Sequence, residues 1–121
     1  MAFFKVSIMK KIKTLKMNYE FKNVLTNGKY FVNRQIIVYI LKNKYDFNRI
    51  GVAVSTKAGK AVKRNRVKRI IREAYYKYKD KLEQPFDIVI MWNKKVNPTD
   101  ASYEIILEDL QNTFKKAGIV R

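Results

Sequence analysis

The sequence contains no histidine and no cysteine among its 121 residues. Without these two residue types, no Ser-His or Cys-His pair, disulfide or thiolate zinc site can form. Acidic residues are also scarce, since 10 Asp and Glu stand against 27 Lys and Arg, for a formal net charge of +17. The ten carboxylates form no Asp-x-Asp or comparable metal motif. The chain therefore offers little acid-base or metal chemistry of its own, and its charge predicts a polyanionic partner, with nucleic acid as the leading candidate.

Long hydrophobic runs are absent as well. An uncharged stretch such as Gln35–Leu41 has only seven residues, whereas a membrane-spanning helix needs about 20. The apolar start of the chain is broken by Lys5, which does not fit a secretory signal. A chain without cysteine is compatible with the reducing cytosol. We therefore expect a cytoplasmic protein without membrane partners.

The length corresponds to one domain, and we divide the chain at residue 17. Residues 1–17 carry five lysines and no acid, and they are expected to form a mobile basic arm that orders on a phosphate backbone. A frayed, solvated terminus is the ordinary alternative. Residues 18–118 are expected to form a single RNA-binding α/β domain.

Apolar spacing predicts three helices. Residues 18–28 read as a short helix with Asn18 as its N-cap and Gly28 in the left-handed position after its end. The main helix is expected within residues 57–78, and the last one from residues 97–100 to Gly118. The main helix has one apolar stripe at helical spacing, formed by Val67, Ile70, Ile71, Ala74, Tyr75 and Tyr78.

Strands are expected between these helices. Gln35–Leu41 is apolar enough for a central strand, Arg49–Ser55 is predicted to pair with it as an antiparallel hairpin, and Phe86–Trp92 is a third strand. Tyr30–Val32 could be a separate extra strand. The order α-β-β-α-β-α, with or without that extra strand, predicts an α/β sandwich of helices packed on a small sheet.

The strongest functional signal is the charge of the main helix. No acid occurs from residue 47 to residue 72, and half of residues 57–72 are basic. With the apolar stripe directed inward, Asn65, Arg69 and Arg72 lie on the opposite side of the helix. An ordinary solvated helix would mix charges of both signs. A face of one sign repels itself unless a polyanion neutralises it, and arginine suits phosphate through its bidentate fork.

Aromatic residues supply a weaker signal. Ile37 and Tyr39 share one face of their strand, and the first helix could leave part of that face open as a groove near Phe21. Such a groove would suit unpaired bases. Taken singly, each of these aromatics is better explained as a core residue than as a stacking one.

The stretch from Gly51 to Ala74 resembles the signature of the bacterial ribonuclease P protein subunit family. The resemblance rests on an Arg-Asn-Arg core at residues 64–66, which follows a G-x-x-V-S-x-K strand and opens a basic helix. It extends to most of residues 15–116. It implies a fold like domain 2 of ribosomal protein S5, with a left-handed βαβ crossover. This is an α/β (α+β sandwich) fold, and it has room in its sheet for the extra strand at Tyr30–Val32.

The resemblance also implies a function. The protein would be a subunit of an endoribonuclease that removes the 5′ leader of precursor tRNA, and the chemistry would belong to the RNA subunit and its bound Mg2+. The implied partners are that RNA and precursor tRNA, with no protein partner required, no catalytic side chain and no confident metal ligand from the protein.

Residue roles carry over by position. The resemblance implies an RNA-subunit surface formed by Lys60, Lys63, Arg64, Asn65, Arg66, Lys68, Arg69 and Arg72. It implies a leader cleft formed by Phe21, Ile37 and Tyr39, with Lys57 on its border. Two other classes stay open on the residues alone. A small ribosomal or other structural RNA-binding protein would share the charge and length, and an autonomous metal-dependent nuclease would need clustered carboxylates.

Overall fold

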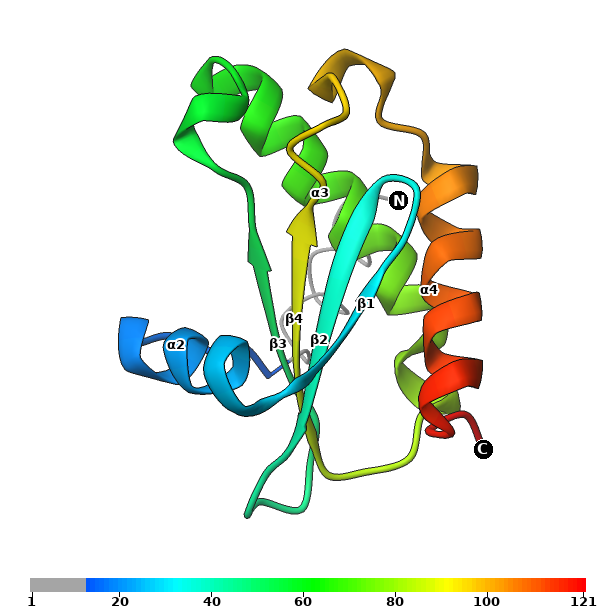
Figure 1. Ribbon diagram of the computed structural model, residues 1–121. Helices are drawn as coiled ribbons and strands as arrows, with labels where there is room; N and C mark the ends of the chain where they lie inside the picture. The colour runs from blue at the N-terminus through cyan, green and yellow to red at the C-terminus, as the bar shows by residue number, and fades with distance from the viewer. Residues whose placement is uncertain (1–12) are drawn as a thin grey trace, which may run out of the picture.

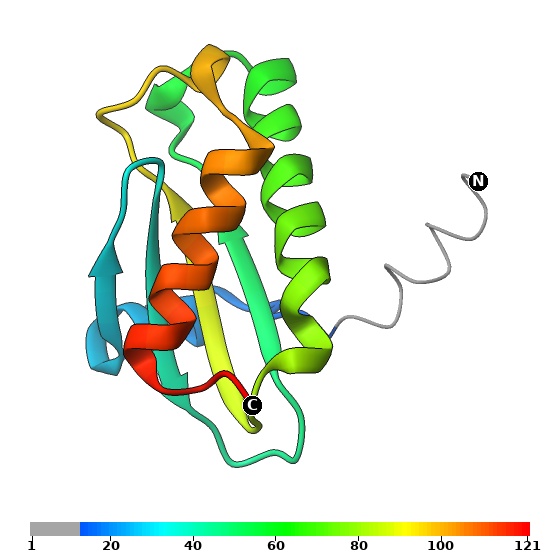
Figure 2. The same cartoon turned by 90° about the vertical axis from the view of Figure 1, so that its right-hand side faces the viewer.

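A computed structural model describes residues 13–121 and shows three layers (Figures 1 and 2). A four-stranded sheet lies in the middle, with α2 on one face and α3 and α4 on the other. The elements, in chain order, are α2 (Asn18–Asn27), β1 (Lys29–Val32), β2 (Ile36–Lys42), β3 (Arg49–Ala53), α3 (Ala61–Tyr78), β4 (Phe86–Trp92) and α4 (Tyr103–Ala117). The α/β sandwich is confirmed, and the extra strand is real and forms β1.

The order of the strands is β1-β2-β4-β3. The predicted hairpin between β2 and β3 is therefore wrong, because β4 lies between them, antiparallel to β2 and parallel to β3. The connection of residues 43–48 is short enough for a hairpin, but it passes the end of β4 instead. Most of β4 is buried, and a central position is the one that covers both faces of such an apolar strand.

The connection from β3 through α3 to β4 joins two neighbouring parallel strands. Figure 2 views the sheet from the helix side, and there the chain leaves β3, forms α3 in front of the sheet and returns as β4 to the left of β3. This crossover is left-handed, as the family resemblance implies, and opposite to the usual hand.

Alternation along β2 divides its side chains between the two layers. Ile36, Val38 and Ile40 are buried against α3 and α4 in the main core, which also contains Phe114 of α4. The residues between them face α2 and are only partly buried. The α2 layer is thin, because its buried cluster consists of Leu15, Val24 and Val89. A thin layer leaves part of this sheet face only partly covered.

Two helix starts differ from prediction. Met17 rather than Asn18 precedes the first turn of α2, and the Glu20 carboxylate accepts hydrogen bonds from the backbone N–H groups of Lys16 and Met17, each at 2.8 Å. The last helix begins only at Tyr103, because residues 98–100 form a separate 3-10 turn. A similar 3-10 turn at residues 56–58 precedes α3, which begins at Ala61.

Glycine is required at the end of α2 for a reason other than the predicted left-handed conformation. Gly28 is extended rather than left-handed, so the prediction for it is wrong. A Cβ at this position would lie 2.6 Å from the carbonyl oxygen of Val24 and 3.0 Å from that of Ile40. The close approach of α2 to β2 is what requires glycine here. Gly118 does adopt the predicted left-handed conformation and ends α4.

The folded part of the chain extends beyond the predicted limits of 18 and 118. Thr14 forms a parallel bridge with Ile50, the backbone of Leu15 donates to Ile50 at 2.9 Å, and the Leu15 side chain is buried. At the other end, Ile119 is buried in the main core. One apolar residue among lysines gave too weak a signal for this short edge pairing. The first 12 residues of the predicted arm lie outside the described residues.

Candidate nucleic-acid interface

The basic face of α3 is built by the burial of its opposite face. Val67, Ile71, Ala74 and Tyr75 are buried in the main core, as the apolar stripe predicts. The remaining positions must then point outward. Among the residues that the resemblance assigns to the RNA subunit, the exposed ones are Lys60, Lys63, Asn65, Arg66, Arg69 and Arg72, and the half-buried ones are Arg64 and Lys68.

These eight side chains have no protein partner within residues 13–121. None of them makes a side-chain hydrogen bond, an ion pair or a cation-π contact there, whereas Arg34 and Arg49 each pair with carboxylates. The first turn of α3 holds no acid, and its N-cap, Lys60, provides no side-chain hydrogen bond. The N-terminal end of α3, where the helix dipole favours an anion, therefore lies among lysine and arginine side chains that no carboxylate of residues 13–121 neutralises. This arrangement is suited to phosphate.

A second basic feature lies at one end of the sheet, where the chain leaves both β3 and β4. Five side chains surround a hollow there and are called the lysine patch: Lys57, Lys60, Lys63, Lys94 and Lys95. Sequence reasoning missed Lys94 and Lys95. The carboxyl ends of two neighbouring parallel strands meet at one edge of a sheet, so the residues that follow β3 and β4 lie close together. The predicted β2–β3 hairpin did not make β3 and β4 neighbours, and Lys94 and Lys95 were therefore not connected with Lys57.

On the α2 side, the strand register lines up two rows of side chains across the sheet. One row is Val32, Ile37, Met91 and Ala53, and the other is Tyr30, Tyr39, Val89 and Gly51. We call these eight residues the apolar sheet face. Val89 is buried beneath α2, whereas Ile37, Tyr39 and Met91 are only partly covered. The face is therefore an open apolar floor beside α2.

Phe21 is both a packing residue and a wall of this floor. It is half-buried, packs on the α2 cluster with Tyr39, and lies so close to Gly51 that a Cβ there would be 2.5 Å from the ring. It also borders a hollow of about 330 Å³ together with Leu15 and Arg72. The structure thus brings Phe21, Tyr39 and the basic helix together. Lys57 belongs to the lysine patch, whereas Phe21 borders the hollow with Leu15 and Arg72.

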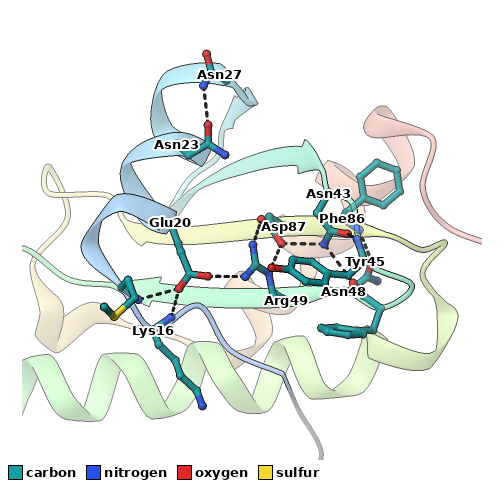
Figure 3. Close-up of polar contacts among 12 residues, drawn as sticks. Lys16, Glu20, Asn23, Asn27, Asn43, Tyr45, Asn48, Arg49, Phe86 and Asp87 are labelled. Carbon is teal, nitrogen blue, oxygen red and sulfur yellow. Dashed lines mark hydrogen bonds and ion pairs between the residues drawn. The ribbon is translucent and has the colours of Figure 1, made fainter.

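An ion network fixes α2 over the sheet (Figure 3). Arg49 pairs with Asp87 at 2.6 Å and with Glu20 of α2, and all three side chains are at most 15% exposed. The Tyr45 ring lies 4.6 Å from the guanidinium carbon. Hydrogen bonds from the backbone N–H groups of Met17 and Lys16, and the pairing with Arg49, lower the pKa of Glu20. Hydrogen bonds to Asp87 raise the pKa of Arg49 further above its usual range.

Two other kinds of site find no support in this part of the molecule. Within residues 13–121, no group of three or more acidic residues is placed to hold a metal ion. None of the helices described is long and apolar enough to cross a membrane. The two buried carboxylates have structural roles, since Asp87 belongs to the Arg49 network and Asp109 accepts a hydrogen bond from the backbone of Gln35 at 2.9 Å.

A basic helix without a protein partner among residues 13–121, together with an open apolar face on the other side of the sheet, defines a nucleic-acid-binding α/β protein. Comparison with known proteins makes this specific. The family model described as Ribonuclease P matches residues 9–118, and the chain belongs to this family, that of the protein component of the tRNA-processing endoribonuclease.

Relatives of known name agree over nearly their whole length. The chain is 41% identical over 108 residues to the ribonuclease P protein component of Clostridioides difficile strain 630, covering 88% of this chain and 93% of the relative. It is 45% identical over 106 residues to that of Clostridium botulinum strain Loch Maree, covering 87% and 94%.

Solved structures give the same result for the fold. The Staphylococcus aureus RNase P protein superposes with a TM-score of 0.78 at 32% identity, covering 92% of this chain and all of that one. The Thermotoga maritima RNase P protein gives 0.75 at 31% identity, covering 86% and 96%. The predicted family, fold class and role as a subunit of an endoribonuclease holoenzyme are therefore confirmed, and its partners are, in general terms, the ribonuclease P RNA and tRNA.

Proposed function

We propose that the two surfaces divide the work of RNA binding, with the basic face of α3 contacting the RNA subunit. The observation that carries this proposal is that eight basic or amide side chains from Lys60 to Arg72 have no partner within residues 13–121. Their charges repel one another in the free protein, so a polyanion gains affinity by neutralising them. Arg64, Arg66, Arg69 and Arg72 can each form two hydrogen bonds to one phosphate.

The part of the apolar sheet face that lies on β2, β4 and β3 is the proposed site for the unpaired 5′ leader of precursor tRNA. Its floor of Ile37 and Tyr39, with Phe21 as a wall, offers stacking and apolar contact with little sequence preference. The lysine patch lies where β3 and β4 end, so it is placed to hold the phosphates of the same strand. In this arrangement Lys57 binds the phosphate backbone of the leader, together with Lys94 and Lys95.

Catalysis is assigned to the RNA. The absence of histidine and cysteine from the sequence leaves the protein without the usual groups for proton transfer at neutral pH. We infer that Mg2+ is the cofactor and is held mainly by the RNA subunit, where phosphate oxygens are abundant. The protein would act in the cytoplasm by orienting the leader and by reducing repulsion between two RNAs.

The salt dependence of affinity tests the role of α3. Binding to the RNA subunit is expected to weaken by about 10³–10⁵-fold between 50 and 200 mM salt if six to ten phosphates are neutralised. Arg69→Ala is expected to reduce the slope by about one contact. Lys116→Ala is the matched control, since this exposed lysine lies on α4. Equal effects of the two variants would contradict the assignment of the α3 face.

Capture of RNA from cell extract, followed by sequencing, separates this function from a ribosomal one. The expected result is one dominant structured RNA together with precursor tRNAs. Recovery of ribosomal RNA alone would overturn the proposal, because a ribosomal protein has no reason to retain tRNA precursors.

A further inference from the structure

The apolar sheet face continues past β2 onto the edge strand β1, where it is most exposed. Tyr30 and Val32 are 66% and 63% exposed, which makes them two of the most exposed large apolar side chains of the described chain. Neither residue belongs to the leader cleft that the family resemblance implies. With their cross-strand partners Tyr39 and Ile37, which are only partly covered, they form one continuous exposed apolar patch, and such patches mark interaction sites.

The strand register fixes the direction of Tyr30. It is the cross-strand partner of Tyr39, and the two ring centroids are 5.9 Å apart with an interplanar angle of 36°. Its neighbour Phe31 turns to the opposite face and packs against the main core. Tyr39 thus supports one side of the Tyr30 ring, while much of the rest of the ring remains open to solvent.

We propose that Tyr30 is a further base-stacking site, which extends the leader surface from the Phe21 side of the sheet to its β1 edge. The inference rests on the proposed role of this face in leader binding and adds a position to it. Two observations favour an unpaired base as the occupant. The surface is continuous with Tyr39 and Ile37, and the only charged residues in β1 and β2 are Lys29 and Lys42. No carboxylate of these two strands would repel a phosphate.

The order of the strands predicts which part of the leader reaches Tyr30. Strands β1 and β3 are the two edges of the sheet, and neighbouring strands are about 4.8 Å apart, so the edges are separated by about 14 Å. Phe21 packs on Gly51 of β3, and the lysine patch follows the same strand. A base on Tyr30 is therefore separated from these contacts by the width of the sheet. Short leaders would fill the Phe21 side only, and longer leaders would add the contact with Tyr30.

The experiment compares leader lengths in the assembled holoenzyme. Precursor tRNAs with leaders shortened one nucleotide at a time are titrated against wild type, Tyr30→Ala, Tyr30→Phe and Tyr19→Ala. Tyr19 is the matched control, since it is 70% exposed on α2 and is not part of the apolar sheet face. Tyr30→Ala is expected to weaken binding of long leaders by about fivefold to hundredfold and to leave the shortest leaders unchanged. Tyr30→Phe, which keeps the ring, is expected to behave like wild type.

Three outcomes would overturn the inference. Long-leader affinity could be unchanged in Tyr30→Ala, or all leader lengths could be affected equally, or the variant could instead abolish self-association through the β1 edge in sedimentation. Phe21→Leu in the same titration distinguishes failure of the Tyr30 site from failure of the whole leader surface. If Phe21→Leu reduces leader affinity and Tyr30→Ala does not, only the added site fails. If neither variant responds to leader length, the proposed leader surface itself fails.

Discussion

Arg49 and Asp87 face each other across neighbouring parallel strands and form two hydrogen bonds. The Arg49 Nε donates to Oδ1 of Asp87 at 2.8 Å, and Nη2 donates to Oδ2 at 2.6 Å. The third nitrogen of the same guanidinium reaches Glu20 in α2. One side chain therefore joins β3, β4 and the helix that borders the apolar sheet face.

Removal of this arginine is expected to destabilise the fold strongly. Arg49→Met leaves Asp87, which is 3% exposed, as a buried charge without its cation, and such losses cost about 3–5 kcal/mol. Urea unfolding measures the change. Lys79→Met is the control, because its partner Asp80 is 87% exposed and such surface pairs contribute about 0–1 kcal/mol. Similar small losses for both variants would show that the network contributes little.

The lowered pKa of Glu20 predicts a dependence of stability on pH. Because the pKa of this carboxylate is lower in the folded state than its ordinary value of 4.5, its contribution to stability is complete above that value. The contribution is lost as the pH falls through the folded-state pKa. Unfolding free energies of wild type and Glu20→Gln are expected to differ at pH 7 and to converge as the pH falls below the folded-state pKa of Glu20. A difference that does not change with pH would mean that the ionised form of Glu20 is not what stabilises α2.

The sequence was sufficient for the parts of the fold that periodicity encodes. The apolar stripe of α3 predicted which residues are buried, and the opposite face followed from it. The pairing of strands could not be predicted from the sequence, because the six-residue connection of residues 43–48 fits a hairpin as well as a passage over the end of β4. That error hid the meeting of Lys57 with Lys94 and Lys95, although all of these residues are visible in the sequence.

Long-range contacts explain the other differences. Gly28 was interpreted from local helix chemistry, whereas the backbone of β2, which follows later in the chain, is what excludes a side chain there. The left-handed crossover came only from the family resemblance, since composition and spacing carry no information on handedness. The ambiguity of Phe21 was inherent, because the structure places this residue in both roles, as packing against Gly51 and as the wall of the open sheet face.

The close contact between Phe21 and Gly51 provides a test of the cleft wall. In Gly51→Ala the new Cβ would lie 2.5 Å from one ring carbon and 2.7 Å from the next, so the ring must move. We expect weaker binding of leader-bearing precursor tRNA and unchanged binding of the RNA subunit. The double variant Gly51→Ala/Phe21→Leu relieves the clash, and its stability is expected to exceed the sum of the single effects by about 0.5–3 kcal/mol. Strict additivity would show that the two residues do not share the space.

The central claim is that this chain assists a catalytic RNA and has no nuclease activity of its own. Cleavage of a precursor tRNA at physiological Mg2+ tests it most directly, with rigorously RNA-free protein, the RNA subunit alone, and both together. We expect no cleavage by the protein alone and efficient release of the 5′ leader only when the two are combined. Robust cleavage by the RNA-free protein would contradict it.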